Sequence, residues 1–196
     1  MAAGASTRMG KPKQLLRYEG ETLISRAVRS AQESKCCRVI VVLGAHASVV
    51  RDEIAETVAS VVINQAWDEG MSSSIRCGLS VLEASGEIEA AILLLCDQPF
   101  VTSKVINRLT DTYYARRPPL VVSEYETGGE RTQGVPALFS RALFPELMSL
   151  SGAEGAKRII ARHASEAVCV AVPEAVFDVD TPDDYYLLCN NIAQGI

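Results

Sequence analysis

Two short, strongly apolar runs constrain the fold of this chain more than any other feature. They lie at 38–44 (RVIVVLG) and 90–96 (AAILLLC), and both have the length of a strand rather than a helix. Apolar runs without polar alternation are typical of parallel strands that helices cover on both faces. Segments with helical periodicity accompany them, at about 23–31, 50–58, 75–82 and 102–113. We therefore predict an α/β fold: a three-layer, doubly wound, mostly parallel, Rossmann-like sheet.

The rest of the chain fits the same alternation. Further short strands are predicted at 60–64, 120–123, 135–139, 168–172 and 176–179, and helices at about 141–150 and 153–162. The polar segment 124–133 contains two glycines and is predicted to be a loop. The last helix should begin with Thr181 as cap, Pro182 in the first turn and Asp184 completing a capping box. Because no linker stands out, we expect residues 1–196 to form one domain.

The composition argues against several functions. The net charge is −5, whereas a protein that binds duplex nucleic acid is usually basic. No apolar run approaches the ~20 residues of a membrane span, and no signal peptide is recognisable. The six cysteines include no C-x-x-C pair, which argues against a zinc site. We expect reduced thiols and a cytoplasmic protein that contacts neither nucleic acid nor membrane.

The segment 2–13 (AAGASTRMGKPK) combines small residues with cations. Ala2, Ala3 and Gly4 would let the backbone approach a phosphate and point N–H groups at it. Arg8 and Lys13 would add the positive charge that a polyphosphate needs. The spacing is not that of a Walker loop. A flexible basic tail explains the same residues equally well.

Aspartates follow two of the predicted strands. Asp97 comes directly after the apolar run 90–96 and would lie at the carboxyl edge of the sheet, where ligands bind. A carboxylate there suits Mg²⁺, which takes one or two carboxylates and substrate phosphates. A simple turn closed by aspartate and proline is the alternative. Asp178 and Asp180 would point to one side of an extended segment, while the next two aspartates serve the dipole of the last helix.

Two further segments could contact substrates. The segment 64–75 (NQAWDEGMSSSI) runs into a predicted helix with Ser72 or Ser73 as cap, and could read a base or a ribose. Capping alone is the alternative. The segment 134–139 (GVPALF) could line an acceptor pocket, or simply turn into a strand.

These motifs together resemble the nucleotidyltransferases with a GT-A-like fold. In particular, the chain resembles the molybdenum cofactor cytidylyltransferases and molybdopterin guanylyltransferases. The resemblance covers the whole chain and rests on six motifs in order, at 2–13, 67–75 (WDEGMSSSI), 95–99 (LCDQP), 134–139, 155–157 (GAK) and 178–182 (DVDTP).

The resemblance implies roles for individual residues on the nucleotide side. Ala2, Ala3 and Gly4 would place backbone against the nucleotide, while Arg8 and Lys13 hold its triphosphate. With Asp97 these two cations would be the catalytic residues. The family usually carries A-G-G in guanylyl-transferring members where this chain has A-A-G, which favours CTP over GTP.

It also implies the remaining contacts. Ser73 and Ser74 would contact base and ribose. Asp97 would bind Mg²⁺, with Asp178 preferred over Asp180 as the second ligand. The acceptor would meet the residues Gln98, Gly134, Val135 and Pro136.

The chain departs from the family pattern at two places. Ala153 stands where the family usually has an aspartate, which weakens the acceptor assignment. The family also implies about six apolar residues of strand before Ala2, so we expect the first strand to be truncated at the N-terminus.

The resulting hypothesis is transfer of CMP from CTP to the terminal phosphate of molybdopterin, with release of pyrophosphate. The alternatives are guanylyl transfer to molybdopterin, nucleotidyl transfer to a sugar or alditol phosphate, and a non-catalytic chaperone that inserts a cofactor into a client molybdoenzyme.

Overall fold

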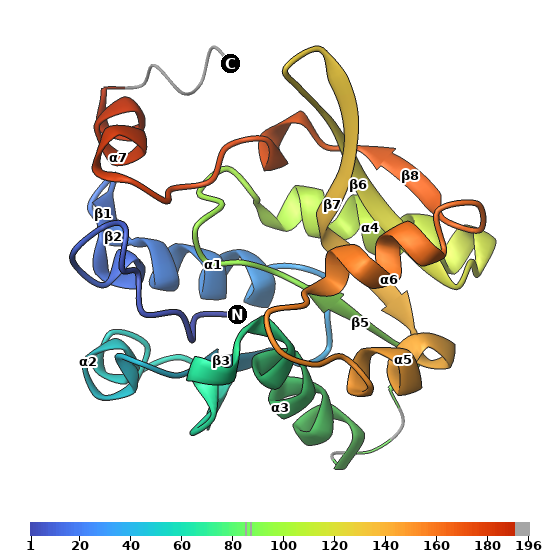
Figure 1. Ribbon diagram of the computed structural model, residues 1–196, viewed down its shortest axis with the longest axis horizontal. Helices are drawn as coiled ribbons and strands as arrows, with labels where there is room; N and C mark the ends of the chain where they lie inside the picture. The colour runs from blue at the N-terminus through green and yellow to red at the C-terminus, as the bar shows by residue number, and fades with distance from the viewer. Residues whose placement is uncertain (85, 87, 191–196) are drawn as a thin grey trace.

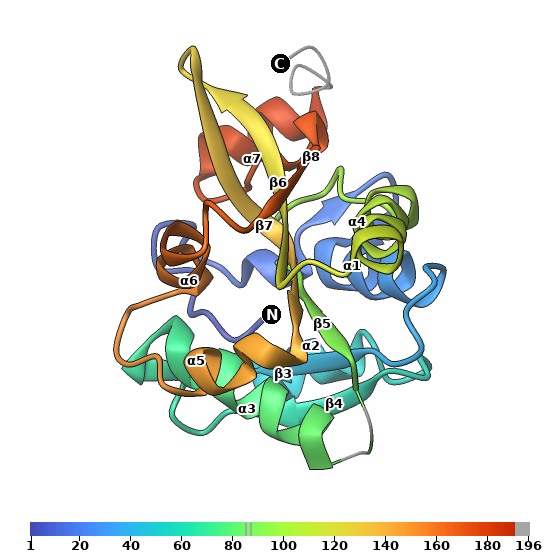
Figure 2. The ribbon, with the colours of Figure 1, turned by 90° about the vertical axis from the view of Figure 1, so that its right-hand side faces the viewer.

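The computed structural model describes residues 1–84, 86 and 88–190, and it confirms the doubly wound α/β class. Helices lie on both sides of the strands, with α1 and α4 on one side of β5 and α5 and α6 on the other (Figures 1 and 2). The strands are β1 (Arg17–Tyr18), β2 (Glu21–Thr22), β3 (Ile40–Leu43), β4 (Ser60–Ile63), β5 (Ala90–Leu93), β6 (Leu120–Thr127), β7 (Glu130–Ser140) and β8 (Val168–Ala171). The α-helices are α1 (Leu23–Gln32), α2 (Ala47–Asp52), α3 (Met71–Ala84), α4 (Ser103–Arg116), α5 (Phe144–Met148), α6 (Ala156–Arg162) and α7 (Pro182–Cys189). Short 3₁₀ turns occupy Lys13–Leu15, Trp67–Glu69, Arg141–Leu143 and Pro173–Ala175.

The strands form a mixed rather than a mostly parallel arrangement. One pair, β3 and β4, is parallel, and a second sheet has the order β5-β7-β6-β8. In that sheet β7 runs antiparallel to both neighbours, while β8 is parallel to β6. The N-terminal residues lie between the two groups: Ala2 makes a parallel contact with Leu43, and the Met1 amine donates to the Leu94 carbonyl at 2.8 Å.

The antiparallel strand arises from a tight hairpin that the sequence analysis interpreted as a loop. Segment 124–133 is the far end of β6 and β7, where Thr127 pairs with Glu130. Gly128 and Gly129 connect the two strands with φ of 61° and 81°. Two successive positive φ values match the right-handed twist of a hairpin, and glycine adopts them without strain.

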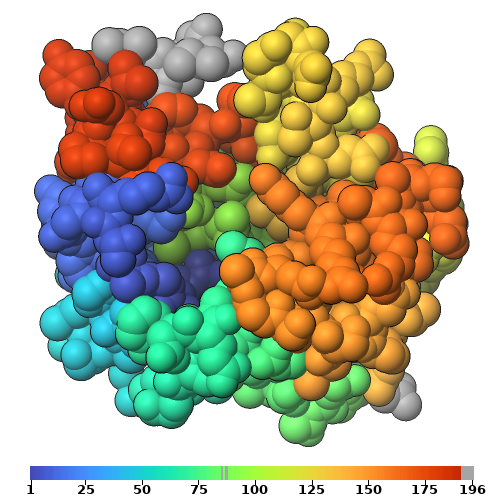
Figure 3. All heavy atoms as spheres, in the orientation of Figure 1, coloured from blue at the N-terminus to red at the C-terminus, as the bar shows by residue number. Residues whose placement is uncertain are grey.

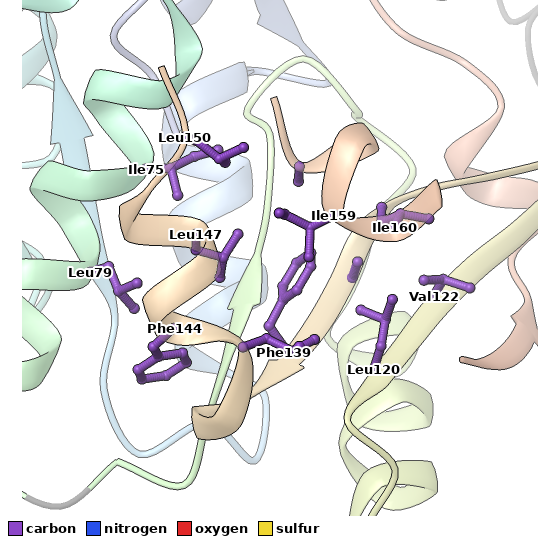
Figure 4. Close-up of a cluster of buried hydrophobic side chains, with 13 residues drawn as sticks. Ile75, Leu79, Leu120, Val122, Phe139, Phe144, Leu147, Leu150, Ile159 and Ile160 are labelled. Atoms are coloured by element: carbon purple, nitrogen blue, oxygen red, sulfur yellow. The ribbon is translucent and has the colours of Figure 1, made fainter. Parts of the chain in front are cut away.

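The core on one side of the sheet is built where α3, α5 and α6 pack on β6 and β7 (Figure 4). Phe139 from β7 and Phe144 from α5 are each 1% exposed, and burying one such side chain stabilises the fold by roughly 1.5–3 kcal/mol. Aliphatic residues complete the cluster, among them Ile75, Leu79, Leu120, Val122, Leu147, Leu150, Ile159 and Ile160.

Some of the predicted helix boundaries are confirmed and others differ in the structure. The capping box at Thr181 and Asp184 is present, with Pro182 in the first turn of α7. The helix expected to reach Val58 ends at Asp52, because Val58 is 93% exposed and gives a continued helix no apolar face. The expected serine cap of α3 is wrong, since the helix already begins at Met71.

The expected strand at 176–179 is also wrong. This segment follows the turn Pro173–Ala175 and belongs to no sheet. It is nevertheless fixed in place, because the Val179 amide donates to the Asp97 carbonyl at 2.9 Å. No helix in the described ranges is long and apolar enough to cross a membrane.

Candidate active site

Four segments distant in the sequence meet around a hollow on one face of the molecule. Figure 3 shows the N-terminal residues in blue, the start of α3 in green and the segment before α6 in orange around this hollow. The segment from 178 to 181 joins them through Asp180, which contacts Arg8 and Lys13. Together with the ion pair between Lys13 and Asp97, these contacts place the segments 2–13, 95–99 and 178–181 at one site.

The loop 2–13 is anchored to β3 by its backbone. The Ala2 amide donates to the Val42 carbonyl at 2.9 Å, and the Ala45 amide donates to the Ala3 carbonyl at 3.1 Å. Gly44 makes this approach possible, since a Cβ there would lie 2.5 Å from the Ala3 carbonyl oxygen and 2.6 Å from the Trp67 Cβ. The backbone of the loop is therefore held in place against β3, and the flexible-tail interpretation is wrong.

Gln14 holds the loop from inside and was not singled out from the sequence. Its side chain is 1% exposed, and its Nε2 donates to the carbonyls of Ala2 at 3.0 Å and Gly4 at 2.9 Å. Ser6, whose φ is +56°, donates from Oγ to Gln14 Oε1 and accepts from the Lys13 amide at 3.1 Å. A polar residue within the short apolar stretch 14–16 was the only signal in the sequence.

The cations of the loop point at carboxylates. Lys13 Nζ donates to Asp97 Oδ2 and, at 2.9 Å, to Asp180 Oδ1. Arg8 is largely exposed and reaches Asp180 Oδ2 at 2.9 Å. Burial alone would lower the pKa of Lys13, but the Asp97 and Asp180 carboxylates outweigh it and raise that pKa. Burial would raise the pKa of Asp180, but the bonds and charges of Lys13 and Arg8 lower it. Lys13 therefore remains charged.

The carboxylates carry more negative charge than these cations balance. Asp97 is 8% exposed, and its Oδ1 is buried with no hydrogen-bond partner among the described residues. Asp178 is exposed, yet partial desolvation and the charge of Asp97 raise its pKa to about 6. Crowded carboxylates with a free buried oxygen fit a hard divalent cation.

These carboxylates would suit a metal ion that substrate phosphates also coordinate. Among the described residues, no three histidine, cysteine, aspartate or glutamate side chains are grouped closely enough to enclose a metal. Mg²⁺ needs only one or two carboxylates when phosphates supply further oxygens. Asp97 is the best placed, with Asp178 or Asp180 as its partner.

Ser73 and Ser74 lie near the loop but are turned inward. Both are buried, and the side-chain amide of Asn64 donates to their hydroxyls at 2.8 and 2.9 Å. The Ser73 hydroxyl also contacts the carbonyls of Ala66 and Gly70 at 2.7 and 2.8 Å. These bonds fix the segment 64–71 beside the loop, so both serines position backbone rather than present free hydroxyls.

The four residues expected on the acceptor side do lie together. Gln98 is 4% exposed and donates from Nε2 to the carbonyls of Val135 and Ala175, each at 3.2 Å. Val135 and Pro136 are joined by a cis peptide bond, and the Pro136 carbonyl accepts from Ser123 at 2.6 Å. Gly134 lies under the Tyr125 hydroxyl, which a Cβ there would approach to 2.5 Å. Gln98 thus ties β7 to the segment that carries Asp178.

Comparison with known proteins identifies the family. The sequence profile described as the MobA-like NTP transferase domain matches residues 1–168. The chain belongs to this family. Its relatives include a nicotine blue oxidoreductase from Paenarthrobacter nicotinovorans, 28% identical over 96% of this chain and 93% of the relative. A molybdenum cofactor cytidylyltransferase from Escherichia coli is 22% identical over 94% of this chain and 90% of its own.

A solved structure agrees with the fold of this NTP transferase. The manganese complex of Rv0371c from Mycobacterium tuberculosis superposes with a TM-score of 0.73 and 31% identity, covering 96% of this chain and 94% of the other. That structure is a complex with manganese.

Proposed function

We propose that this NTP transferase moves CMP from CTP to the terminal phosphate of molybdopterin and releases pyrophosphate. The observation that carries the proposal is the convergence of Lys13, Arg8, Asp97 and Asp180 at the end of a rigid loop. Paired cations suit the phosphates of an NTP, and a free carboxylate oxygen suits the Mg²⁺ that accompanies them. The relative named as a molybdenum cofactor cytidylyltransferase supports the acceptor class.

Each residue group has a proposed role. The backbone at Ala2, Ala3 and Gly4 faces the nucleotide, and Lys13 and Arg8 bind the β- and γ-phosphates. Asp97 holds Mg²⁺ with Asp178 or Asp180. When bound, the metal ion would neutralise phosphate charge.

The chemistry requires positioning more than proton transfer. An oxygen of the acceptor phosphate attacks the α-phosphorus of CTP, and the bond from that phosphorus to the bridging oxygen breaks. Pyrophosphate leaves with the electron pair, and the charge that develops on it is stabilised by Lys13 and Arg8. The attacking phosphate is already anionic, so no general base is needed.

Ser73 and Ser74 contribute indirectly in this proposal. Through Asn64 they hold the segment 64–71 against the loop, and the backbone of that segment would contact the base and ribose. Gln98 and the segment 134–136 would shape the acceptor side. Ala3 occupies the position at which guanylyl-transferring members of the family usually have glycine, and this favours CTP over GTP as the substrate.

Pyrophosphate release tests the proposal directly. Purified protein with Mg²⁺ and molybdopterin should release pyrophosphate from CTP faster than from GTP, ATP or UTP. Asp97→Asn should lose at least 99% of the rate, whereas Asp111→Asn, at an exposed surface pair with Lys35, should keep it. Sugar and alditol phosphates serve as competing acceptors, and turnover with one of them would replace the acceptor in the proposal.

Binding without chemistry would support a different function. If CTP binds and no acceptor is converted, the non-catalytic cofactor-insertion chaperone becomes the better account, and a client molybdoenzyme should then be sought. Guanylyl transfer would be favoured by pyrophosphate release from GTP alone. The cytoplasmic location remains a prediction, in keeping with six free cysteines.

A further inference from the structure

His46 lies beside the loop 2–13 and has no role in the proposed function. It immediately precedes α2, yet its side chain makes no capping bond to that helix. Its Nε2 instead lies 3.1 Å from the Ala5 carbonyl oxygen. Because a carbonyl oxygen can only accept, Nε2 carries a hydrogen and donates it to this bond. The side chain of His46 therefore supports the loop rather than its own helix.

The bond reaches the loop from the side that faces away from the hollow. Figure 1 labels α2 below the N-terminal residues, and Figure 3 shows its region in cyan at the outer side of the blue loop. The backbone before His46 holds the loop from the same side, because the Ala45 amide donates to the Ala3 carbonyl at 3.1 Å. His46 continues this attachment from Ala3 to Ala5.

Holding the Ala5 carbonyl fixes the direction of the next amide. The C=O and N–H groups of a trans peptide point in opposite directions, and the peptide between Ala5 and Ser6 is trans. With the carbonyl turned to His46, the Ser6 N–H points away from α2 and toward the hollow. The part of the chain that the structure describes gives this N–H no acceptor. The Ser6 amide is therefore a free donor on the side where Lys13 and Asp97 lie.

Ser6 alone would not favour this orientation of the peptide. Its φ is +56°, a left-handed conformation that residues with a side chain rarely adopt. Rotating the peptide between Ala5 and Ser6 by about 180° would bring φ into the extended region. That rotation would also turn the Ala5 carbonyl oxygen toward the hollow, where it would repel phosphate oxygens. The bond from His46 opposes the rotation, because it is lost when the carbonyl turns.

We propose that His46 is a positioning residue that aims the Ser6 amide at an outer phosphate of the nucleoside triphosphate. The inference rests on the proposed function, since it requires that the loop binds a phosphate chain. Ser6 is two residues before Arg8, and its Oγ accepts from the Lys13 amide at 3.1 Å. It therefore lies beside the two cations assigned to the β- and γ-phosphates. A donor already held in the binding orientation loses less entropy when the phosphate binds. His46 itself touches no substrate.

Calorimetric titration with tripolyphosphate and Mg²⁺ tests the inference, because this probe carries the phosphate chain without a base or a sugar. His46→Leu removes the donor, whereas His46→Gln keeps a side-chain N–H at a similar reach. His46→Leu should weaken binding about tenfold, as expected for one hydrogen bond to a charged group. His46→Gln should restore binding to within about twofold of the wild type. The control His163→Leu makes the same change at the end of α6 and should leave binding unchanged.

The Ser6 amide supplies a readout that a purely structural role of His46 would not move. In amide NMR spectra of labelled protein, its proton resonance should move downfield when tripolyphosphate is added to the wild type or His46→Gln. It should not do so in His46→Leu. If His46→Leu folds poorly, His46→Asn replaces it, since its polar side chain is too short to reach the Ala5 carbonyl.

The outcomes separate this inference from the proposed function. Undiminished binding in His46→Leu, an equal loss in His46→Gln, or a Ser6 resonance that responds alike in all variants would overturn the role of His46 alone. A wild-type protein that binds neither tripolyphosphate nor CTP would overturn the proposed function, and this inference with it. None of these measurements depends on turnover.

Discussion

Replacing Gln14 with leucine should destabilise both the fold and the nucleotide loop. Gln14→Leu keeps the size of the side chain but removes the two bonds from Nε2 to the carbonyls of Ala2 and Gly4. Gln14 is 1% exposed, and its bond to the Ala2 carbonyl is buried, so water does not replace the donor lost there. Each buried carbonyl left without a partner costs about 1–3 kcal/mol. The cost is smaller for the Gly4 carbonyl, because that group is only partly buried and water can bind it. We expect a loss of about 3 kcal/mol in the free energy of unfolding.

Urea denaturation at pH 7, with and without CTP and Mg²⁺, measures the effect. The KM for CTP should also rise at least fivefold, because the loop backbone is no longer fixed. Gln133→Leu is the matched control, since that glutamine lies on the hairpin and its Nε2 donates to the Cys169 Sγ at 3.2 Å. It should change stability by less than about 0.5 kcal/mol. A Gln14→Leu protein that matches the wild type in both readouts would refute the account of the loop.

Two further substitutions test other parts of the site. Gly44→Ala should lower the free energy of unfolding by about 1–3 kcal/mol, because its Cβ meets the Ala3 carbonyl, whereas Gly4→Ala, with open space around the Cβ, should not. Asp178→Asn should stabilise the protein above pH 6. The native state holds the Asp178 proton up to a pKa of about 6, against an ordinary value of 3.8, so ionisation disfavours the native state above that pH and has no effect below pH 4. Solvent screening at this accessible position limits the gain to about 1 kcal/mol at pH 8. Urea denaturation at pH 4 and pH 8 measures it, and an equal gain at both pH values would contradict the raised pKa of Asp178.

Local patterns predicted the features that depend on neighbouring residues. The apolar runs became β3 and β5, and the capping box at Thr181 formed as expected. The hairpin at Gly128 and Gly129 was missed because two glycines between polar residues indicate a loop as readily as a turn with two positive φ values. The cap of α3 was wrong because three successive serines each satisfy the same local preference.

The site depended on contacts that are distant in the sequence. Lys13 and Asp180 are 167 residues apart, and the strand expected before Asp180 does not form, so the resemblance to the nucleotidyltransferases was what placed both residues near the triphosphate in advance. Gln14 could not be recognised, since its role follows from burial beneath the loop. Ser73 was predicted to be near the nucleotide, but the tertiary contact with Asn64 turns its hydroxyl inward.

The central claim is that the loop 2–13 binds a triphosphate, and calorimetric titration tests it most directly. In the presence of Mg²⁺, CTP should bind the wild-type protein at least tenfold more tightly than CMP, because in the proposed function Lys13 and Arg8 bind only the β- and γ-phosphates. Lys13→Met should remove most of that preference while leaving the affinity for CMP within about twofold, as one charge-assisted contact is worth about 1.5–3 kcal/mol. Equal affinities for CTP and CMP in the wild type, or an unchanged preference in Lys13→Met, would contradict it.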